Sequence, residues 1–351
     1  MSLTFILAIS VSFVIAFLFT PVVKNIFISR NWIEDPHLKQ QKTHNATASS
    51  SVPRGGGIPI FFAVLLTSLV FLPPTKQLIG ILLGALIALI VGIFDDVKDL
   101  SPRLRLFTNL FSALIVVGSG IGIAYISNPF GAPVDLSYPR LVFNFFGPHS
   151  IWLIADLLAI VWIVWCQNIV GWAAGVEGQL PGYVAISAIF IGILGLRFSG
   201  DVAEFPVIIL SAAIAGAYLG FLPFNFFPQK IMPGYSGKSL AGFFLAVLSI
   251  LSGAKVATLI LLLGIPMIDA VFVIIRRLRQ RKSIFLSDGS HFHHQLLQLG
   301  WSRQSIAILY WVFSFLLGLA SLFLNSQQKF YLFVAVFFLF SGIVLKVSRR
   351  I

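Results

Sequence analysis

Charge is scarce in this chain. Only 10% of its 351 residues are charged, against roughly a quarter in soluble globular proteins, and 58% are hydrophobic. The single cysteine, Cys166, excludes a disulfide framework and a cysteine-based metal cluster. Acidic residues number 12 against 24 Lys and Arg, so the net charge is +12. Such a charge attracts nucleic acid or anionic lipid, and the hydrophobic composition favours membrane lipids, so we expect no nucleic-acid partner.

Long apolar runs recur along the whole chain at lengths that suit membrane helices. We predict eleven spans, at Leu3–Val23, Gly57–Leu72, Leu78–Phe94, Leu104–Ile126, Ile151–Gln167, Leu180–Phe198, Phe205–Phe224, Ser239–Leu251, Val256–Ile275, Gln304–Leu324 and Phe330–Leu345. Ser239–Leu251 is short and could form one re-entrant hairpin with the next run, which makes ten spans the alternative. The sequence therefore predicts an all-α polytopic integral membrane protein, with residues 1–351 forming a single transmembrane domain.

Lysine and arginine are distributed unevenly between alternate connections. Nineteen of the 24 fall on one predicted side and five on the other. Basic residues concentrate on the cytoplasmic side of membrane proteins, so this bias predicts that the N-terminus lies outside and the C-terminus inside. The N-terminal run lacks a basic n-region and a small-residue cleavage site, so we do not expect it to be a cleaved signal peptide.

Three aspartates stand at one predicted helix end: Asp95, Asp96 and Asp99. On a helix, Asp95 and Asp99 share a face, with Asp96 about 100° away. Charge near hydrocarbon costs a few kcal/mol per group and needs a partner. Two interpretations fit: the cluster holds a divalent cation, or it is a helix end neutralised by the basic residues that follow.

Two more predicted cytosolic loops carry polar groups. Arg54 precedes three glycines, whose unshielded N–H groups at a helix start suit phosphate, although a flexible linker is the alternative. A later loop runs from Asn168 to Gly178 and holds one acid, Glu177. Glu177 could reach a metal held by the aspartates or be a solvated loop acid.

Three histidines within four residues, His291, His293 and His294, follow a strongly basic stretch. Imidazoles bind metals, and they also donate hydrogen bonds to a pyrophosphate. Their density on the same predicted side as the aspartates indicates a functional site rather than an ordinary loop.

These loops resemble, in this order and on one predicted side, those of the polyprenyl-phosphate N-acetylhexosamine-1-phosphate transferases, glycosyltransferase family 4. The matching residues are Lys42, His44, Pro53, Arg54, Gly55, Gly56, Asp95, Asp96, Leu100, Asn168, Gly175, Gly178, Asn225, Pro228, Pro266, Asp269, Asp288, His291, His293 and His294. The histidine pattern is similar to the branch that uses UDP-N-acetylglucosamine or a related UDP-sugar. The branch that makes the first lipid intermediate of peptidoglycan instead has three successive histidines followed by Phe and an acid.

The resemblance implies transfer of a sugar-1-phosphate from a UDP-sugar to undecaprenyl phosphate, with release of UMP. It implies assistance by Mg²⁺, with Mn²⁺ as the alternative, and a multi-pass protein of a bacterial-type cytoplasmic membrane that is either a monomer or a homodimer. Asp95 and Asp96 would be catalytic and, with Glu177, would bind the metal. The implied substrate-binding residues are Lys42, His44, Arg54, Asn168, Asn225, His291, His293 and His294.

Four positions depart from the family pattern. Gly171 replaces an Asn, Ala174 and Glu177 replace aspartates, and Tyr235 replaces the metal-binding Asp of a Gly-Asp-x-Gly-Ser motif. A phenol is a poor substitute for a carboxylate at Mg²⁺. Three hypotheses remain: an active transferase with a rearranged site, a catalytically silent relative that binds a lipid phosphate or a protein partner, and a transporter with an intramembrane anion path.

Overall fold

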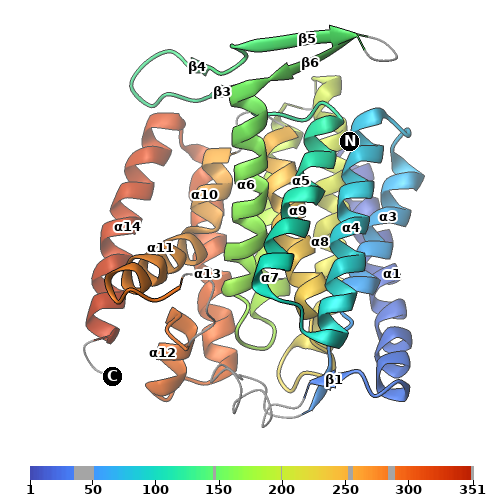
Figure 1. The fold of residues 1–351 in the computed structure, drawn as a ribbon, viewed down its shortest axis with the longest axis vertical. Coiled ribbons are helices and arrows are strands. Elements are labelled where there is room, and N and C mark those ends of the chain that lie inside the picture. Colours follow the sequence, from blue (N-terminus) through green and yellow to red (C-terminus); the bar gives the residue numbers. More distant parts are fainter. Residues whose placement is uncertain (35–50, 145–147, 199, 252–255, 284–288, 349–351) are drawn as a thin grey trace.

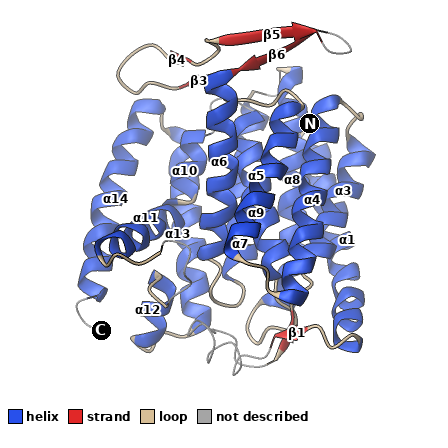
Figure 2. Cartoon of the chain, viewed as in Figure 1, coloured by secondary structure: helices blue, strands red, loops and turns tan. Residues whose placement is uncertain are grey.

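The computed structural model describes residues 1–34, 51–144, 148–198, 200–251, 256–283 and 289–348. Helices dominate it (Figures 1 and 2). They are α1 (Ser2–Ser29), α3 (Gly57–Phe71), α4 (Lys76–Lys98), α5 (Pro102–Gly118), α6 (Leu153–Trp172), α7 (Gln179–Arg197), the 3-10 helix η1 (Val202–Glu204), α8 (Phe205–Asn225), α9 (Gly234–Leu251), α10 (Val256–Leu262), α11 (Gly264–Arg279), α12 (Phe292–Gln298), α13 (Arg303–Phe323) and α14 (Ser326–Ser348).

The strands form three small antiparallel hairpins outside the helix bundle. The pairs are β1 (Ile33–Glu34) with β2 (Val52–Pro53), β3 (Tyr125–Ile126) with β4 (Val134–Asp135), and β5 (Arg140–Asn144) with β6 (Pro148–Trp152). Figure 1 shows β1 at one end of the bundle and the β5–β6 hairpin at the opposite end. We call the end that carries β1 and α12 the site end.

The predicted all-α polytopic membrane class is confirmed. In the described part of the chain, eight helices are long and apolar enough to cross a membrane, or nine if one bent pair counts as a single span. Two further predicted runs correspond to the shorter helices α3, with 15 residues, and α5, with 17. The run predicted to reach Ile126 is wrong at its end, because α5 ends at Gly118 and Tyr125–Ile126 form β3. In Figure 1, α1 begins toward one end of the bundle and α14 ends toward the other, as an odd number of crossings requires. The number of crossings and the side of the membrane that each end faces stay predictions.

The predicted run Val256–Ile275 is not one continuous helix. It breaks between α10 and α11 with a bend of 78°. Pro266 has no N–H to donate to the carbonyl of Leu262 four residues earlier, so the helix cannot continue unchanged. The hydroxyl of Ser314 in α13 donates to that carbonyl at 3.0 Å, which satisfies a group that the bilayer could not. The structure favours a separate span over the alternative hairpin of Ser239–Leu251 with the next run, because α9 begins at Gly234 and is by itself a span candidate.

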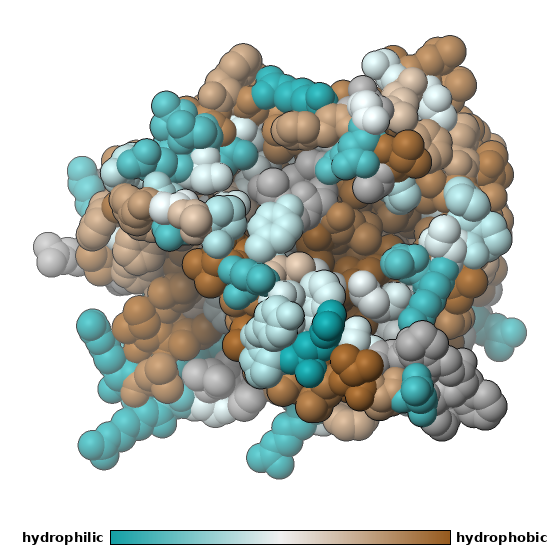
Figure 3. All heavy atoms as spheres, turned by 90° about the horizontal axis from the view of Figure 1, so that it is seen from above, coloured by the Kyte–Doolittle hydropathy of each residue, from teal (hydrophilic) through white to brown (hydrophobic). Residues whose placement is uncertain are grey.

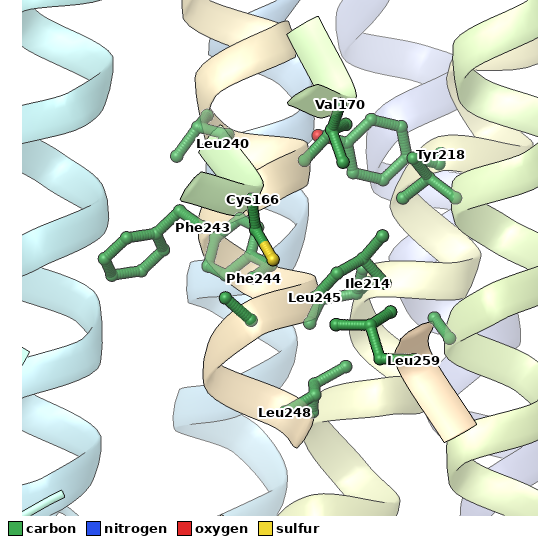
Figure 4. Close-up of a cluster of buried hydrophobic side chains, with 14 of the residues drawn as sticks. Cys166, Val170, Ile214, Tyr218, Leu240, Phe243, Phe244, Leu245, Leu248 and Leu259 are labelled. Carbon is green, nitrogen blue, oxygen red and sulfur yellow. The ribbon is translucent and has the colours of Figure 1, made fainter. Parts of the chain in front are cut away.

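The core of the bundle forms around α9, which packs against α4 and α6. Figure 4 shows apolar side chains of α9, among them Phe244 and Leu245, meeting residues of neighbouring helices such as Tyr218, and it places Cys166 inside this cluster. Without association driven by water, membrane helices rely on close packing at small residues. A Cβ on Gly92 of α4 would lie 2.3 Å from Ser236 Cα, so only glycine lets α4 approach the start of α9 this closely.

Lipid-facing surface surrounds this core. Helices α1 and α14 expose many large hydrophobic side chains, such as Leu3 and Phe338, as expected of helices that contact lipid. Figure 3, which views the molecule from above Figure 1, shows hydrophilic side chains scattered among hydrophobic ones over that end face. The exposed apolar side surfaces and the apolar helices make this a multi-pass membrane protein.

Candidate active site

The end of α4 and the start of α5 position the first part of the site. Helix α4 ends at Lys98, and Asp99 takes the left-handed conformation with φ 49°. Ser101 then caps α5 by accepting a hydrogen bond from Leu104 N at 3.4 Å. This three-residue turn places Arg105, in the first turn of α5, beside Asp95, in the last turn of α4. Arg105 Nε donates to Asp95 Oδ1 at 2.5 Å.

Asp96 caps the start of α9. Its carboxylate accepts hydrogen bonds from Tyr235 N at 2.5 Å, from Ser236 N at 3.3 Å and from Ser236 Oγ at 2.5 Å. The unpaired N–H groups and the positive dipole end of a helix N-terminus favour an anion there. Gly234, with φ 65°, makes this approach possible, because a Cβ would lie 2.3 Å from Asp96 Oδ2. Asp96 therefore has a structural role that the sequence did not reveal.

Arg54 stands among four carboxylates. Its guanidinium nitrogens lie 3.3 Å from Glu34, 3.7 Å from Asp96, 3.8 Å from Asp95 and 2.7 Å from Asp99. Burial lowers the pKa of Arg54, but attraction to Asp96, Glu34 and Asp99 outweighs burial and raises that pKa above its usual value. The predicted substrate-binding Arg54 thus holds the acidic cluster together. Its pairing with Glu34 was not predicted, because nothing in the sequence distinguishes Glu34 from an ordinary loop acid.

Asp95 is buried with one oxygen that makes no hydrogen bond within the described residues. Its Oδ1 accepts hydrogen bonds from Arg105 and from Leu100 N at 3.1 Å, whereas its Oδ2, in that part of the chain, has only the ion-pair contact with the Arg54 guanidinium, at 3.8 Å. A buried carboxylate oxygen without a hydrogen bond costs free energy, so Oδ2 is the position in this cluster where a ligand would gain most. Four carboxylates and two guanidiniums also leave this cluster with a formal charge of −2.

Two of the predicted histidines are buried around α12. His291 Nδ1 lies 2.8 Å from Asp269 Oδ2, and Phe292 N donates to Asp269 Oδ1 at 2.9 Å. Asp269 thereby fixes the start of α12. The rings of His293 and His291 lie parallel with centroids 5.8 Å apart. Burial, followed by the nearby groups His294, His291 and Lys238, lowers the pKa of His293 well below its usual value, so His293 is neutral at physiological pH.

The glycine loop after α6 meets the histidines directly. A Cβ on Gly175 would lie 1.8 Å from His293 Nε2, so only glycine fits this position. The charge of Lys238 in α9 helps to lower the pKa of His293. Lys238 follows Tyr235 by three residues, so Lys238 and Tyr235 lie on one face of α9. Since Tyr235 N binds Asp96, the first turn of α9 links the aspartates to the histidines. The structure thus brings these separate loops together at the site end (Figure 1).

Glu177 has other partners. Its carboxylate lies 3.2 Å from Arg303 Nε, and Gln229 Nε2 donates to it at 3.5 Å. In the covered ranges, no three His, Cys, Asp or Glu side chains form a group that could hold a metal ion. The structure therefore does not gather Glu177 with Asp95 and Asp96 into a three-carboxylate metal site.

The two predicted asparagines contact backbone. Asn225 Oδ1 accepts from Gly178 N at 3.0 Å, and its amide donates to Ile231 O at 3.0 Å, so Asn225 joins the glycine loop to the loop after α8. Asn168 donates to Val164 O of its own helix at 2.7 Å. Substrate binding by either side chain stays a prediction. Lys42, His44 and Asp288 lie outside the described residues.

The three glycines after Arg54 do not form an open phosphate cradle. Gly56 N donates to Met232 O at 3.0 Å, and a Cβ on Gly56 would lie 2.5 Å from Phe221. Gly55 and Gly57 are packed as tightly, against Phe27 and Ser236 respectively. These glycines allow the loop to pack between helices.

Two acids within apolar runs, Asp156 and Asp269, are where an intramembrane anion path would have to be sought, and both have local roles. Asp156 lies in the first turn of α6 and accepts from Trp152 N at 3.0 Å. Asp269 holds His291 and the start of α12. Neither acid therefore needs an ion path to explain it.

The comparisons with known proteins identify the family of this chain. The model of glycosyl transferase family 4 matches residues 78–253, half of the chain, which run from α4 to the end of α9. The chain belongs to glycosyl transferase family 4. The matched segment contains the aspartate pair, the glycine loop and the start of α9.

The similarity to relatives extends over most of this chain. One, from Bacillus subtilis, is named a probable undecaprenyl-phosphate N-acetylglucosaminyl 1-phosphate transferase and is 29% identical over 95% of this chain and 90% of its own length. A decaprenyl-phosphate N-acetylglucosaminephosphotransferase of Mycobacterium leprae is 27% identical over 79% of this chain and 75% of its own. A phospho-N-acetylmuramoyl-pentapeptide-transferase of Oceanobacillus iheyensis is 26% identical over 90% of this chain and 97% of its own.

Proposed function

We propose that this family 4 member transfers an N-acetylhexosamine-1-phosphate, most simply N-acetylglucosamine-1-phosphate, from a UDP-sugar to undecaprenyl phosphate. An oxygen of the lipid phosphate attacks the β-phosphorus of the UDP-sugar, a new P–O–P linkage forms, and the bond to the bridging oxygen breaks so that UMP leaves. The buried Oδ2 of Asp95 carries the proposal. It makes no hydrogen bond within the described residues, where its ion-pair partner is Arg54 at 3.8 Å, and it lies within a site that joins acids, arginines and histidines at one end of the bundle.

The acidic cluster suits a divalent cation. Magnesium is usually bound through one or two carboxylates together with substrate phosphates, so a three-carboxylate cage is not required. Asp95, whose Oδ2 makes no hydrogen bond within the described residues, would be the protein ligand, and Asp96 would add charge from the adjacent position. The formal −2 charge of the cluster matches a dication. When bound, Mg²⁺ would neutralise the phosphate charge that builds up during transfer; Mn²⁺ is the alternative metal.

The chain's own residues would orient the two anions. Asp95 would orient or deprotonate the lipid phosphate, whose second pKa of about 6 makes strong base catalysis unnecessary. Neutral His293, held against Gly175, can donate one hydrogen bond and accept another, and His291 is fixed by Asp269. Both histidines suit the sugar nucleotide's polar groups. The protein would act in a bacterial-type cytoplasmic membrane, where the lipid phosphate and the cytosolic nucleotide meet at the headgroup level.

The test uses purified full-length protein with undecaprenyl phosphate, Mg²⁺ and radiolabelled UDP-N-acetylglucosamine. We expect release of UMP and a labelled lipid, and we expect Asp95→Asn to abolish both. If no label reaches the lipid, either from this donor or from other radiolabelled UDP-N-acetylhexosamines, the proposal is refuted. Arg140→Gln, on the β5–β6 hairpin at the opposite end, is the matched control and should transfer normally.

A catalytically silent relative is the second candidate, and specific observations favour it. Ala174 and Tyr235 lack the carboxylates that the resemblance implies, and Glu177 is paired with Arg303. The double change Ala174→Asp and Tyr235→Asp separates the candidates. Transfer gained from none supports a silent relative, whereas transfer lost from a working level supports a site rearranged around Tyr235.

A further inference from the structure

We propose that Arg105 binds a substrate phosphate beside Asp95, and that Tyr235 is the positioning residue that holds it there. The inference deepens the proposed function, because it assigns a substrate contact to two residues at the same site. The ligand chemistry is a phosphate oxygen, which either the lipid phosphate or the nucleotide pyrophosphate supplies.

The two arginines of the acidic cluster are committed to different degrees. Arg54 is 12% exposed, and its nitrogens face four carboxylates. Arg105 is 30% exposed, and only its Nε makes a hydrogen bond within the described residues, to Asp95. Its Nη2 lies 4.0 Å from Asp99, beyond hydrogen-bond distance. Since a guanidinium carries five N–H donors, Arg105 keeps most of them for a ligand.

Tyr235 supports the flat face of Arg105. The guanidinium carbon of Arg105 lies 5.0 Å from the centroid of the Tyr235 ring, within cation–π distance. Tyr235 is held at its backbone and at its hydroxyl, because its N–H donates to Asp96 at 2.5 Å and its hydroxyl donates to Asn109 Oδ1 at 3.2 Å. Stacking occupies the face of the guanidinium and leaves its edge donors free for planar recognition of an anion.

This arrangement explains why a tyrosine suits position 235. A carboxylate there would lie next to Arg105, and it would draw the free N–H donors into another ion pair. A neutral aromatic ring holds the same guanidinium in place and leaves its charge available. With tyrosine in place of a carboxylate at position 235, Arg105 remains a positioned cation beside the aspartate pair.

The experiment measures binding rather than turnover. UDP and undecaprenyl phosphate are titrated separately, by calorimetry, into the detergent-solubilised full chain carrying Arg105→Gln, Arg105→Lys, Tyr235→Leu or Tyr235→Phe. Arg140→Gln is the matched control, because Arg140 also lies over a tyrosine ring, 6.0 Å from Tyr138, at the opposite end of the bundle. Size exclusion and thermal unfolding show which variants are folded.

We expect Arg105→Gln to weaken binding of one ligand by about 10- to 100-fold, as loss of a charged hydrogen bond does, and thereby to identify which phosphate it holds. Arg105→Lys should recover part of this affinity. Tyr235→Leu should weaken the same ligand by about 3- to 20-fold through loss of the cation–π contact, whereas Tyr235→Phe keeps the ring and should stay within about 3-fold. Unchanged affinity for both ligands in folded Arg105→Gln would overturn the inference. So would equal losses in Tyr235→Phe and Tyr235→Leu, or equal losses in Arg105→Gln and Arg140→Gln.

Failure of the inference and failure of the proposed function are distinguishable. A chain that binds phosphate through Arg105 and transfers no sugar phosphate supports the inference and refutes the function. A chain that transfers sugar phosphate, but whose affinities for UDP and undecaprenyl phosphate are unchanged by Arg105→Gln, supports the function and refutes the inference. A folded chain that binds neither ligand refutes both.

Discussion

Asp96 and Asp99 both contact Arg54, yet their substitutions should have unequal costs. Asp96 is buried and accepts three hydrogen bonds from the start of α9. Asp96→Asn keeps the shape of the side chain, but its NH₂ group then faces an N–H or O–H donor, and the negative charge at the helix N-terminus is lost. Charged hydrogen bonds contribute about 1.5–3 kcal/mol each, and breaking a buried ionic contact costs about 3–5 kcal/mol. We therefore expect Asp96→Asn to lower the free energy of unfolding by about 2–4 kcal/mol.

Asp99 is the matched control within the same cluster. Its side chain is 73% exposed, although it lies only 2.7 Å from Arg54. Solvent screens such a pair, so Asp99→Asn should cost less than about 1 kcal/mol. The assay is thermal unfolding of both variants in one detergent at one scan rate, compared as apparent midpoints. Equal shifts in the two variants, or an unshifted Asp96→Asn, would refute the argument that Asp96 caps α9.

Three further predictions concern the loops around the aspartates. Gly175→Ala should lower transfer at least tenfold by displacing His293, at an overpacking cost of about 1–3 kcal/mol, whereas Gly171→Ala, whose Cβ would lie 3.7 Å from Lys238 Cβ, should transfer normally in the same radiolabel assay. The pKa of His293 is lowered in the folded state, so near pH 6.5 the unfolded chain binds a proton that the folded chain does not bind. The free energy of unfolding should therefore fall as pH drops below about 6.5. His293→Gln should flatten thermal midpoints measured from pH 5 to 8, and a fall as steep as that of the parent would contradict this assignment. Mg²⁺ at about 100 times its dissociation constant should stabilise the parent by about 2.7 kcal/mol; EDTA should reverse this shift and stop transfer, and Asp95→Asn should show no shift with Mg²⁺.

Local patterns predicted the elements of the fold well. Runs of apolar residues must form helices in lipid because every backbone N–H and C=O needs an internal partner. Ten predicted runs therefore have a single helix at their place, and the eleventh has the bent pair α10 and α11. The bend had a local signal in Pro266, but the hydrogen-bond partner of the freed Leu262 carbonyl is Ser314, which is distant in sequence.

The sequence predicted which polar residues share one end of the bundle, but it did not predict their partners. Asp95, Asp96 and the histidines do lie at one end of the bundle. Glu177, however, pairs with Arg303. The pairing of Glu177 with Arg303 depends on how α13 packs against the glycine loop. The spacing of residues along the chain does not predict this packing.

By itself, the sequence determined that this protein spans a membrane many times, that its polar loops collect on one predicted side, and which family it resembles, because hydropathy, basic residues and motifs are local properties. The tertiary structure alone decided which charges meet. Arg54 reaches Asp99 across 45 residues, and Asp96 reaches the start of α9 across about 140. Those contacts follow from glycines that bring helices within van der Waals distance, and such packing is a property of the assembled bundle.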